Sequence, residues 1–235
     1  MNITEISNIP VHCFSNIDEA VNYILTKGEG KIAVAINPEK ILTALQSPEI
    51  RQIILAADIR YLDGIGTVKV AQSKLNKKLA RIPGCELWQA LMEEAGIQHK
   101  TVFLLGADKN VVMNTKQKLE KKYSTNIIGA QDGFFTDDDV MIAKILEYQP
   151  DILTVAMGSP RQEQFMSKCK AQGVTSFMMG VGGTYNVFTG SVKRAPKLWC
   201  DLGLEWLYRL LLEPTRIKRQ LKLLKFLWLF IIKKL

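Results

Sequence analysis

Residues 152–164 have the sequence Ile-Leu-Thr-Val-Ala-Met-Gly-Ser-Pro-Arg-Gln-Glu-Gln, and this stretch indicates the fold class. The apolar run at 152–156 is typical of a strand that is buried on both faces. A glycine loop follows it, and a helical pattern then covers residues 160–172. A strand, a short loop and a helix in this order form the repeating unit of a parallel α/β sheet.

The same alternation continues along the chain in both directions. Apolar runs predict strands at residues 31–36, 59–62, 101–105, 126–129 and 176–179, and helical patterns lie at 84–95, 109–122 and 138–148. We therefore expect an α/β fold, with a Rossmann-like, mostly parallel sheet and helices on both faces. After residues 194–196 the pattern is helical to the end. We divide the chain into a Rossmann-like domain at 1–195 and a helical, basic and amphipathic appendage at 196–235.

The composition excludes several classes of protein. The chain has 235 residues, of which 47% are hydrophobic and 23% charged, so it is not a disordered chain. Its four cysteines form no CxxC pair, and only two histidines could join them, so we expect no disulfide framework, no metal site and no cofactor. No signal-peptide pattern and no bilayer-spanning apolar run is found, and we expect a cytoplasmic protein.

The positive charge is concentrated at the C-terminus. Residues 214–235 contain seven basic and no acidic residues, which accounts for +7 of the net charge of +8. A local cluster of this kind indicates an anionic surface as partner and argues against nucleic acid. Lys218, Lys222 and Lys225 recur at helical spacing beside an apolar stripe, and residues 226–232 are continuously apolar.

This tail is too short to span a bilayer but is suited to lying in the headgroup region. We therefore expect peripheral association with the anionic inner face of the cytoplasmic membrane. The alternative is a helix that packs on the core and exposes a solvated basic face.

Polar and glycine-rich segments follow most of the predicted strands. In open α/β sheets ligands bind beyond the carboxyl ends of the strands. Asp63 is the carboxylate after the second predicted strand, and glycine loops follow the later ones at 106–108, 158–163 and 180–184. These loops could present backbone N–H groups to a phosphate. A glycine at the end of a single strand usually reflects turn geometry alone, but three such loops at one edge favour phosphate binding. Asp63 could also be a turn or cap residue.

Two other site types fit the sequence less well. Residues 136–139, Thr-Asp-Asp-Asp, have the spaced carboxylates of a metal-dependent sugar transferase, but Thr136 and Asp139 also form a capping box, which we prefer. A dinucleotide site would need a glycine fingerprint after the first strand, where Asn37 and Pro38 stand instead. This argues against a nucleotide-binding oxidoreductase.

Seven motifs, at residues 37–40, 61–64, 81–84, 155–163, 179–188, 192–196 and 202–209, occur in this order over nearly the whole chain. Together they resemble the WecG/TagA/CpsF glycosyltransferase family. The Gly-Ser-Pro and Gly-Gly-Thr-Tyr segments and the run Arg-Ile-Lys-Arg-Gln-Leu at 216–221 are most similar to its enterobacterial common antigen branch, the UDP-N-acetyl-D-mannosaminuronic acid transferases.

The resemblance implies an inverting transfer of N-acetyl-D-mannosaminuronic acid from a UDP donor to N-acetylglucosamine-diphospho-undecaprenol, giving lipid II of enterobacterial common antigen. Asp63 matches the family's proposed general base, and Asn37 is the second catalytic candidate. Arg209, Arg216 and Arg219 fit the arginines with which relatives are thought to complete the site over the diphosphates. The other substrate-binding candidates are Arg81, Gly106, Gly158, Arg161, Gln162, Glu163, Gly182, Gly183, Asn186, Lys193 and Arg194.

Some positions depart from the family pattern. Asn186 stands where Asp is common, and Ala35 stands where teichoic-acid relatives carry threonine. Lys40 is a candidate by position for the donor's carboxylate. Transfer of uncharged N-acetylmannosamine, as in teichoic acid synthesis, is the alternative reaction, and a nonenzymatic membrane adaptor is the alternative class. The sequence is compatible with a homo-oligomer and leaves the oligomeric state open.

Overall fold

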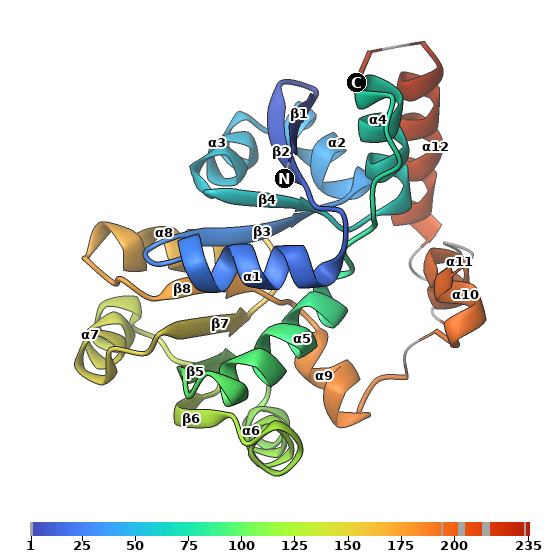
Figure 1. Ribbon diagram of the computed structural model, residues 1–235. Coiled ribbons are helices and arrows are strands. Elements are labelled where there is room, and N and C mark those ends of the chain that lie inside the picture. Colours follow the sequence, from blue (N-terminus) through green and yellow to red (C-terminus); the bar gives the residue numbers. More distant parts are fainter. Residues whose placement is uncertain (1, 194, 202–204, 213–216, 233) are drawn as a thin grey trace.

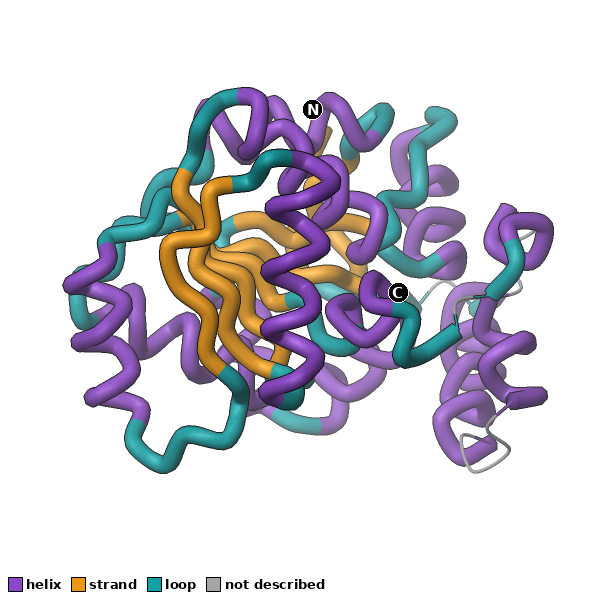
Figure 2. The backbone as a smooth tube through the Cα atoms, turned by 90° about the horizontal axis from the view of Figure 1, so that it is seen from below, coloured by secondary structure: helices purple, strands orange, loops and turns teal. Residues whose placement is uncertain are grey.

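The computed structural model describes residues 2–193, 195–201, 205–212, 217–232 and 234–235, and its centre is one eight-stranded sheet (Figure 1). The strand order is β1-β2-β4-β3-β8-β7-β5-β6, and β1 with β2 is the antiparallel pair, whereas the other pairings are parallel. Figure 2 shows the twisted sheet with helices packed on either side. The predicted fold class is confirmed.

All six predicted strands are present, and two more precede them. The strands are β1 (Asn2–Ile6), β2 (Ile9–Cys13), β3 (Ile32–Ile36), β4 (Ile59–Leu62), β5 (Thr101–Gly106), β6 (Asn126–Gln131), β7 (Ile152–Ala156) and β8 (Phe177–Gly180). The sequence analysis missed β1 and β2. They form an edge hairpin whose two-residue turn has positive φ at Ser7 and Asn8, and most of β1 is exposed, so it lacks the continuous apolar run of a buried strand.

The helices flank this sheet. They are α1 (Ile17–Lys27), α2 (Pro38–Gln46), α3 (Pro48–Ala56), α4 (Ile65–Leu75), α5 (Gly84–Ile97), α6 (Lys109–Tyr123), α7 (Asp138–Tyr148), α8 (Arg161–Ala171), α9 (Thr184–Thr189), α10 (Lys197–Asp201), α11 (Glu205–Leu212) and α12 (Ile217–Ile231). The four predicted helices correspond to α5, α6, α7 and α8. The predicted helical tail corresponds to α10, α11 and α12.

Two hydrophobic cores lie on opposite faces of the sheet because successive strand residues point to opposite sides. Val34 packs into one core and Ala33 into the other. The first core contains side chains of α2, α3, α4, α7, α8 and α12, and the second contains those of α1, α5, α6 and α9. The sheet therefore holds its strand ends, and the loops after them, in fixed positions.

Helix caps at this edge explain two polar motifs. Asn37 Oδ1 accepts a hydrogen bond from the Lys40 N–H at 2.8 Å and caps α2. Within residues 136–139, the capping role is also confirmed, but the capping residue is Asp137 and not Thr136. Asp137 Oδ1 accepts from the N–H groups of Asp139 and Val140.

The last helix, α12, packs against α2 and α4 (Figure 1). Phe226 is only 4% exposed and belongs to the first core, and Leu229 and Phe230 pack against the same core. The expectation that the whole run 226–232 is available to lipid is therefore wrong, because part of it is needed to close the core. The division of the chain at residue 195 stays a prediction.

The opposite face of α12 is apolar and exposed. Leu224, Leu227, Trp228 and Ile231 follow the spacing of one helix face, and Trp228 and Ile231 are 56% and 69% exposed. No helix in the described part of the chain is long and apolar enough to cross a membrane.

Candidate active site

A cleft of about 1210 Å³ opens at the carboxyl ends of β3, β4 and β8. The strand order runs in opposite directions on the two sides of the β3–β8 pair, and such a switch point is where open α/β sheets bind ligands. The floor contains Ala35, Tyr61 and Gly180, and α11 and α12 add a wall with Trp206, Leu224 and Leu227.

Asp63 lies in the lining of this cleft directly after β4. Its N–H donates to the Ile36 carbonyl at 3.1 Å, and its Oδ1 accepts from the N–H of Gly84, the first residue of α5, at 3.3 Å. The N-cap of α4 is Gly64, without a side-chain cap. Asp63 is therefore not the cap of the helix that follows it. Its negative charge faces the positive end of the α5 dipole, which stabilises a carboxylate.

Asn37 also lines the cleft, but its side-chain oxygen is engaged in the cap of α2. This engagement fixes the orientation of the amide, and the NH2 group is the part that can donate to a ligand. The geometry supports a role for Asn37 in orienting a ligand.

Three polar side chains form a hydrogen-bonded group along the cleft. Lys40 Nζ and Gln162 Nε2 donate to Glu163 Oε1 at 2.7 and 3.2 Å, and Gln162 Oε1 accepts from the Gly182 N–H at 3.0 Å. A Cβ atom added at Gly180 would lie 2.5 Å from Gln162 Nε2, so a larger residue there would displace the Gln162 side chain. The group ties the glycine-rich loop after β8 to α2 and α8.

The Glu163 side chain is 2% exposed and does not line the cleft. Burial alone raises the pKa of Glu163, but the Lys40 ammonium and the hydrogen bonds from Lys40 and Gln162 outweigh this effect and lower the pKa below its ordinary value. Glu163 is thus an ionised support beneath the site, and it holds Lys40 and Gln162, which do line the cleft.

The cleft contains most of the other predicted positions. Gly182, Gly183, Asn186 and Lys193 line it, and so does Arg81. The Arg81 guanidinium lies 3.5 Å from Glu205 Oε2, and this ion pair joins the segment between α4 and α5 to α11. The lining contains the basic residues Lys40, Lys69, Arg81 and Lys193 and the acidic residues Glu39, Asp63 and Glu205, so the basic residues exceed the acidic ones by one. These basic side chains are the groups that could attract an anionic ligand.

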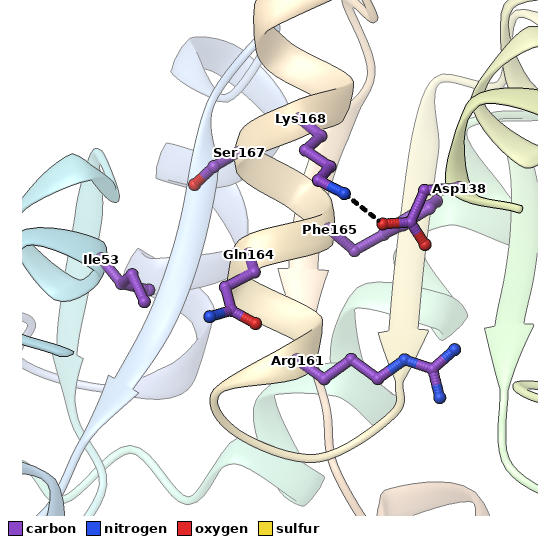
Figure 3. A pocket seen from close by; sticks show the side chains of 7 residues that line it. All are labelled: Ile53, Asp138, Arg161, Gln164, Phe165, Ser167 and Lys168. Atoms are coloured by element: carbon purple, nitrogen blue, oxygen red, sulfur yellow. Dashed lines mark hydrogen bonds and ion pairs between the residues drawn. The ribbon is translucent and has the colours of Figure 1, made fainter. Parts of the chain in front are cut away.

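Besides Glu163, three predicted positions lie away from the cleft lining. Gly106 and Gly158 do not belong to it, and a Cβ atom at Gly106 would lie 2.5 Å from the Ala156 carbonyl oxygen, so this glycine serves strand packing. Arg161 is exposed, stacks over the Phe135 ring at 5.4 Å, and lines a separate shallow hollow beside the Asp138–Lys168 ion pair (Figure 3). Its placement gives no support for a contact with a ligand in the cleft.

The structure does not describe the side chains of four predicted arginines. Arg194 and Arg216 lie outside the described residues, and so do the side chains of Arg209 and Arg219. Their predicted roles stay predictions.

The sequence analysis missed several lining residues. Tyr61, Cys85 and Ser159 belong to the cleft, as do Leu223 and Phe230 of α12. Tyr61 could have been found, because it stands two residues before Asp63 and residues at this spacing share a face of a strand. The contribution of α12 depends on tertiary packing and has no local pattern.

The family model described as "Glycosyl transferase WecG/TagA/CpsF family" matches residues 4–235. The match therefore spans both the sheet and the tail helices, including every residue that lines the cleft. Such enzymes move a sugar from a nucleotide-sugar donor to an acceptor, and the cleft offers a carboxylate, a glycine-rich loop and cations for that task. The chain belongs to the WecG/TagA/CpsF family of glycosyl transferases.

Proposed function

We propose that the protein transfers N-acetyl-D-mannosaminuronic acid from UDP to N-acetylglucosamine-diphospho-undecaprenol, with inversion at the sugar. The observation that carries the proposal is the position of Asp63, which lines the cleft where the ends of β3, β4 and β8 converge. An acceptor hydroxyl is a weak nucleophile until a base accepts its proton in the transition state. Asp63 is that base.

The reaction forms one bond and breaks one. The acceptor oxygen attacks the anomeric carbon from the face opposite UDP, its proton passes to Asp63, and the bond between the anomeric carbon and the β-phosphate oxygen breaks. UDP leaves as an anion, and cations and backbone N–H groups that line the cleft stabilise its charge. Arg81 and the loop at Gly182 and Gly183, which line the cleft, are our candidates for this task.

The carboxylate of the proposed donor needs a cation of its own. Lys40 is a poor choice, because its ammonium is already compensated by the buried Glu163 at 2.7 Å. Lys69 and Lys193 also line the cleft, and we propose Lys193 for the carboxylate because it follows the glycine-rich loop and α9.

The compensation of Lys40 also favours the second candidate, transfer of uncharged N-acetylmannosamine. A competition assay with UDP-N-acetylmannosaminuronic acid and UDP-N-acetylmannosamine decides between them. Preference for the acidic donor, reduced in Lys193→Met, supports the first reaction. Preference for the uncharged donor excludes it.

The tail supports a lipid-linked acceptor at an anionic membrane. Leu224 and Leu227 belong both to the exposed apolar face of α12 and to the cleft lining, so this apolar face runs into the cleft without a break. Lys225 and Lys234 are exposed on the same tail, and each basic residue at an anionic leaflet contributes about 1 kcal/mol. We propose that the enzyme is peripheral on the inner face of the cytoplasmic membrane, with the lipid acceptor entering along α12.

Release of UDP, measured with and without the undecaprenyl-linked acceptor, tests this function. We expect release that depends on the acceptor. A nonenzymatic adaptor would bind anionic vesicles without releasing UDP in either case, and acceptor-independent release would indicate hydrolysis in place of transfer.

A further inference from the structure

The floor of the cleft contains a buried tyrosine hydroxyl that has no hydrogen-bond partner among the described residues. Four buried side-chain polar atoms of the described residues have no hydrogen-bond partner in the protein: Ser7 Oγ, Tyr61 Oη, Trp88 Nε1 and Glu163 Oε2. Of these four residues, Tyr61 alone lines the cleft. Buried donors are almost always paired, because an unpaired one destabilises the folded state. An orphaned hydroxyl at this place therefore points to a ligand atom as its partner.

The surroundings of the hydroxyl place it beside the general base. Tyr61 is 1% exposed, and its ring packs in the core between the sheet and α5. A Cβ atom added at Gly84 would lie 3.0 Å from Tyr61 Oη, and the N–H of Gly84 donates to Asp63. Gly84 is thus the common neighbour of the hydroxyl and the carboxylate.

The part of the cleft beside the Tyr61 ring has room for a small apolar group. Ala35 is the neighbour of Tyr61 in the adjacent strand, and paired residues of parallel strands point to the same face. The Ala35 side chain is a single methyl group, so it leaves space above the sheet at this position. Ala35, the Tyr61 ring and Pro83 all line the cleft and give it an apolar floor.

The negative charge of Asp63 restricts which ligand group can bind the Tyr61 hydroxyl. Burial, followed by the negative charge of Asp63, raises the pKa of Tyr61 well above its usual value, so the phenol stays neutral and can donate. A second anion so close to Asp63 would be repelled. The partner of the hydroxyl is therefore an uncharged oxygen, and the diphosphate lies elsewhere in the cleft.

We propose that Tyr61 Oη donates a hydrogen bond to the acetamido carbonyl oxygen of the donor's N-acetylhexosamine, with the acetamido methyl group over Ala35 and Pro83. Tyr61 is then a specificity-determining residue, which selects an N-acetylated sugar and positions it beside Asp63. This inference rests on the proposed function, because it assumes that the donor is a UDP-linked N-acetylhexosamine.

A second buried tyrosine provides the matched control. The Tyr185 side chain is fully buried and does not line the cleft, and its hydroxyl is satisfied. It donates to the Thr154 carbonyl at 2.9 Å and lies 2.6 Å from Thr154 Oγ1. Tyr61→Phe removes an orphaned hydroxyl, whereas Tyr185→Phe removes a paired one and leaves the partner atoms unsatisfied.

The experiment compares full-length wild type, Tyr61→Phe and Tyr185→Phe by thermal melting and by calorimetric titration with UDP, UDP-mannose and UDP-N-acetylmannosamine. We expect Tyr61→Phe to melt at the wild-type temperature or above it and to bind UDP and UDP-mannose like wild type. Its affinity for UDP-N-acetylmannosamine should fall by about 3- to 10-fold, which corresponds to one neutral hydrogen bond. Tyr185→Phe should melt at a lower temperature with wild-type affinities.

Three results overturn the inference. If Tyr61→Phe binds UDP-N-acetylmannosamine as tightly as wild type, the hydroxyl meets only water. If its affinities for UDP and UDP-mannose fall equally, the hydroxyl contacts another part of the donor. If Tyr61→Phe melts lower, like Tyr185→Phe, its hydroxyl is structural. Failure of wild type to bind any UDP-sugar would remove the proposed function as well, whereas normal wild-type binding with an unaffected Tyr61→Phe removes this inference alone.

Discussion

The floor of the cleft and its tail-side wall are built in different ways. The floor consists of strand ends held by neighbouring strands and by a buried polar group around Glu163. The wall consists of α11 and α12, which are joined to the body by the Arg81–Glu205 ion pair and by the packing of Phe226. The floor can hold reacting atoms within a fraction of an ångström. The wall exposes apolar side chains of α12. Substitutions in the floor should therefore change chemistry or stability, and those on the outside of the wall should change membrane affinity.

The largest expected effect is on turnover, from Asp63→Asn in the floor. The amide cannot accept the proton of the acceptor hydroxyl, so turnover should fall by roughly two to four orders of magnitude. The melting temperature and the affinity for UDP should stay near those of wild type. Steady-state transfer at saturating donor gives the turnover, and a value within a factor of about three of wild type would remove Asp63 from the role of base.

The next effect is on stability, from Lys40→Met in the same region. The substitution leaves Glu163 buried without its cation and should lower the free energy of unfolding by about 3–5 kcal/mol. The whole free energy of unfolding is about 5–15 kcal/mol for a typical domain. The double variant Lys40→Met/Glu163→Gln should recover most of the loss. Urea unfolding at pH 7 measures both.

The loss of stability in Lys40→Met should become smaller as the pH falls. The folded wild type has a lowered Glu163 pKa, so the stabilisation is complete above the unfolded value of about 4.3 and disappears as the pH falls through the folded pKa. In Lys40→Met the ammonium that opposes burial is lost and only the weaker hydrogen bond from Gln162 remains, so we expect burial to raise the pKa of Glu163. Acid then protonates the carboxyl and relieves the cost. The two unfolding free energies should therefore converge as the pH falls from 7 toward 4.5. A constant difference would show that the ion pair is not the cause.

A smaller effect separates the two faces of α12. Phe226→Ala should lower the free energy of unfolding by about 2–3 kcal/mol, because its ring is buried in the core. Trp228→Ala should hardly change stability but should weaken sedimentation with anionic vesicles by roughly tenfold, because its exposed ring is available to lipid. Equal effects of both variants on stability and on vesicle binding would contradict the separation of the faces.

The last prediction is that chelation of metal ions has no effect on sugar transfer. The aspartates at 137–139 do not line the cleft, and each has a partner elsewhere. Asp137 caps α7, Asp138 pairs with Lys168 at 2.6 Å (Figure 3), and Asp139 accepts from Gln172 at 2.7 Å. EDTA should therefore leave transfer to the lipid acceptor unchanged. Loss of transfer that magnesium or manganese restores would show that a metal ion takes part.

Much of the body was predictable because its patterns are local. The strands β3, β5, β7 and β8 are short, largely apolar runs, and a buried parallel strand needs such a run whatever its neighbours are. Asp63 was predictable as a site residue because it directly follows one of these strands. The edge strand β1 was missed because it exposes one side and does not need a continuous apolar run. The buried strand β2 was missed because Pro10 and His12 interrupt its apolar run.

The sequence by itself determined the fold class, the family and the edge of the sheet where the cleft lies. The tertiary structure decided that Glu163 is buried as a support, that Phe226 belongs to the core, and that Tyr61 carries an orphaned hydroxyl. The physical reason is that a strand or a helix follows from neighbours within a few residues, whereas burial and hydrogen-bond satisfaction depend on groups far apart in the chain. Lys40 and Glu163 are separated by 123 positions, and their ion pair exists only after the sheet has brought α2 and α8 together.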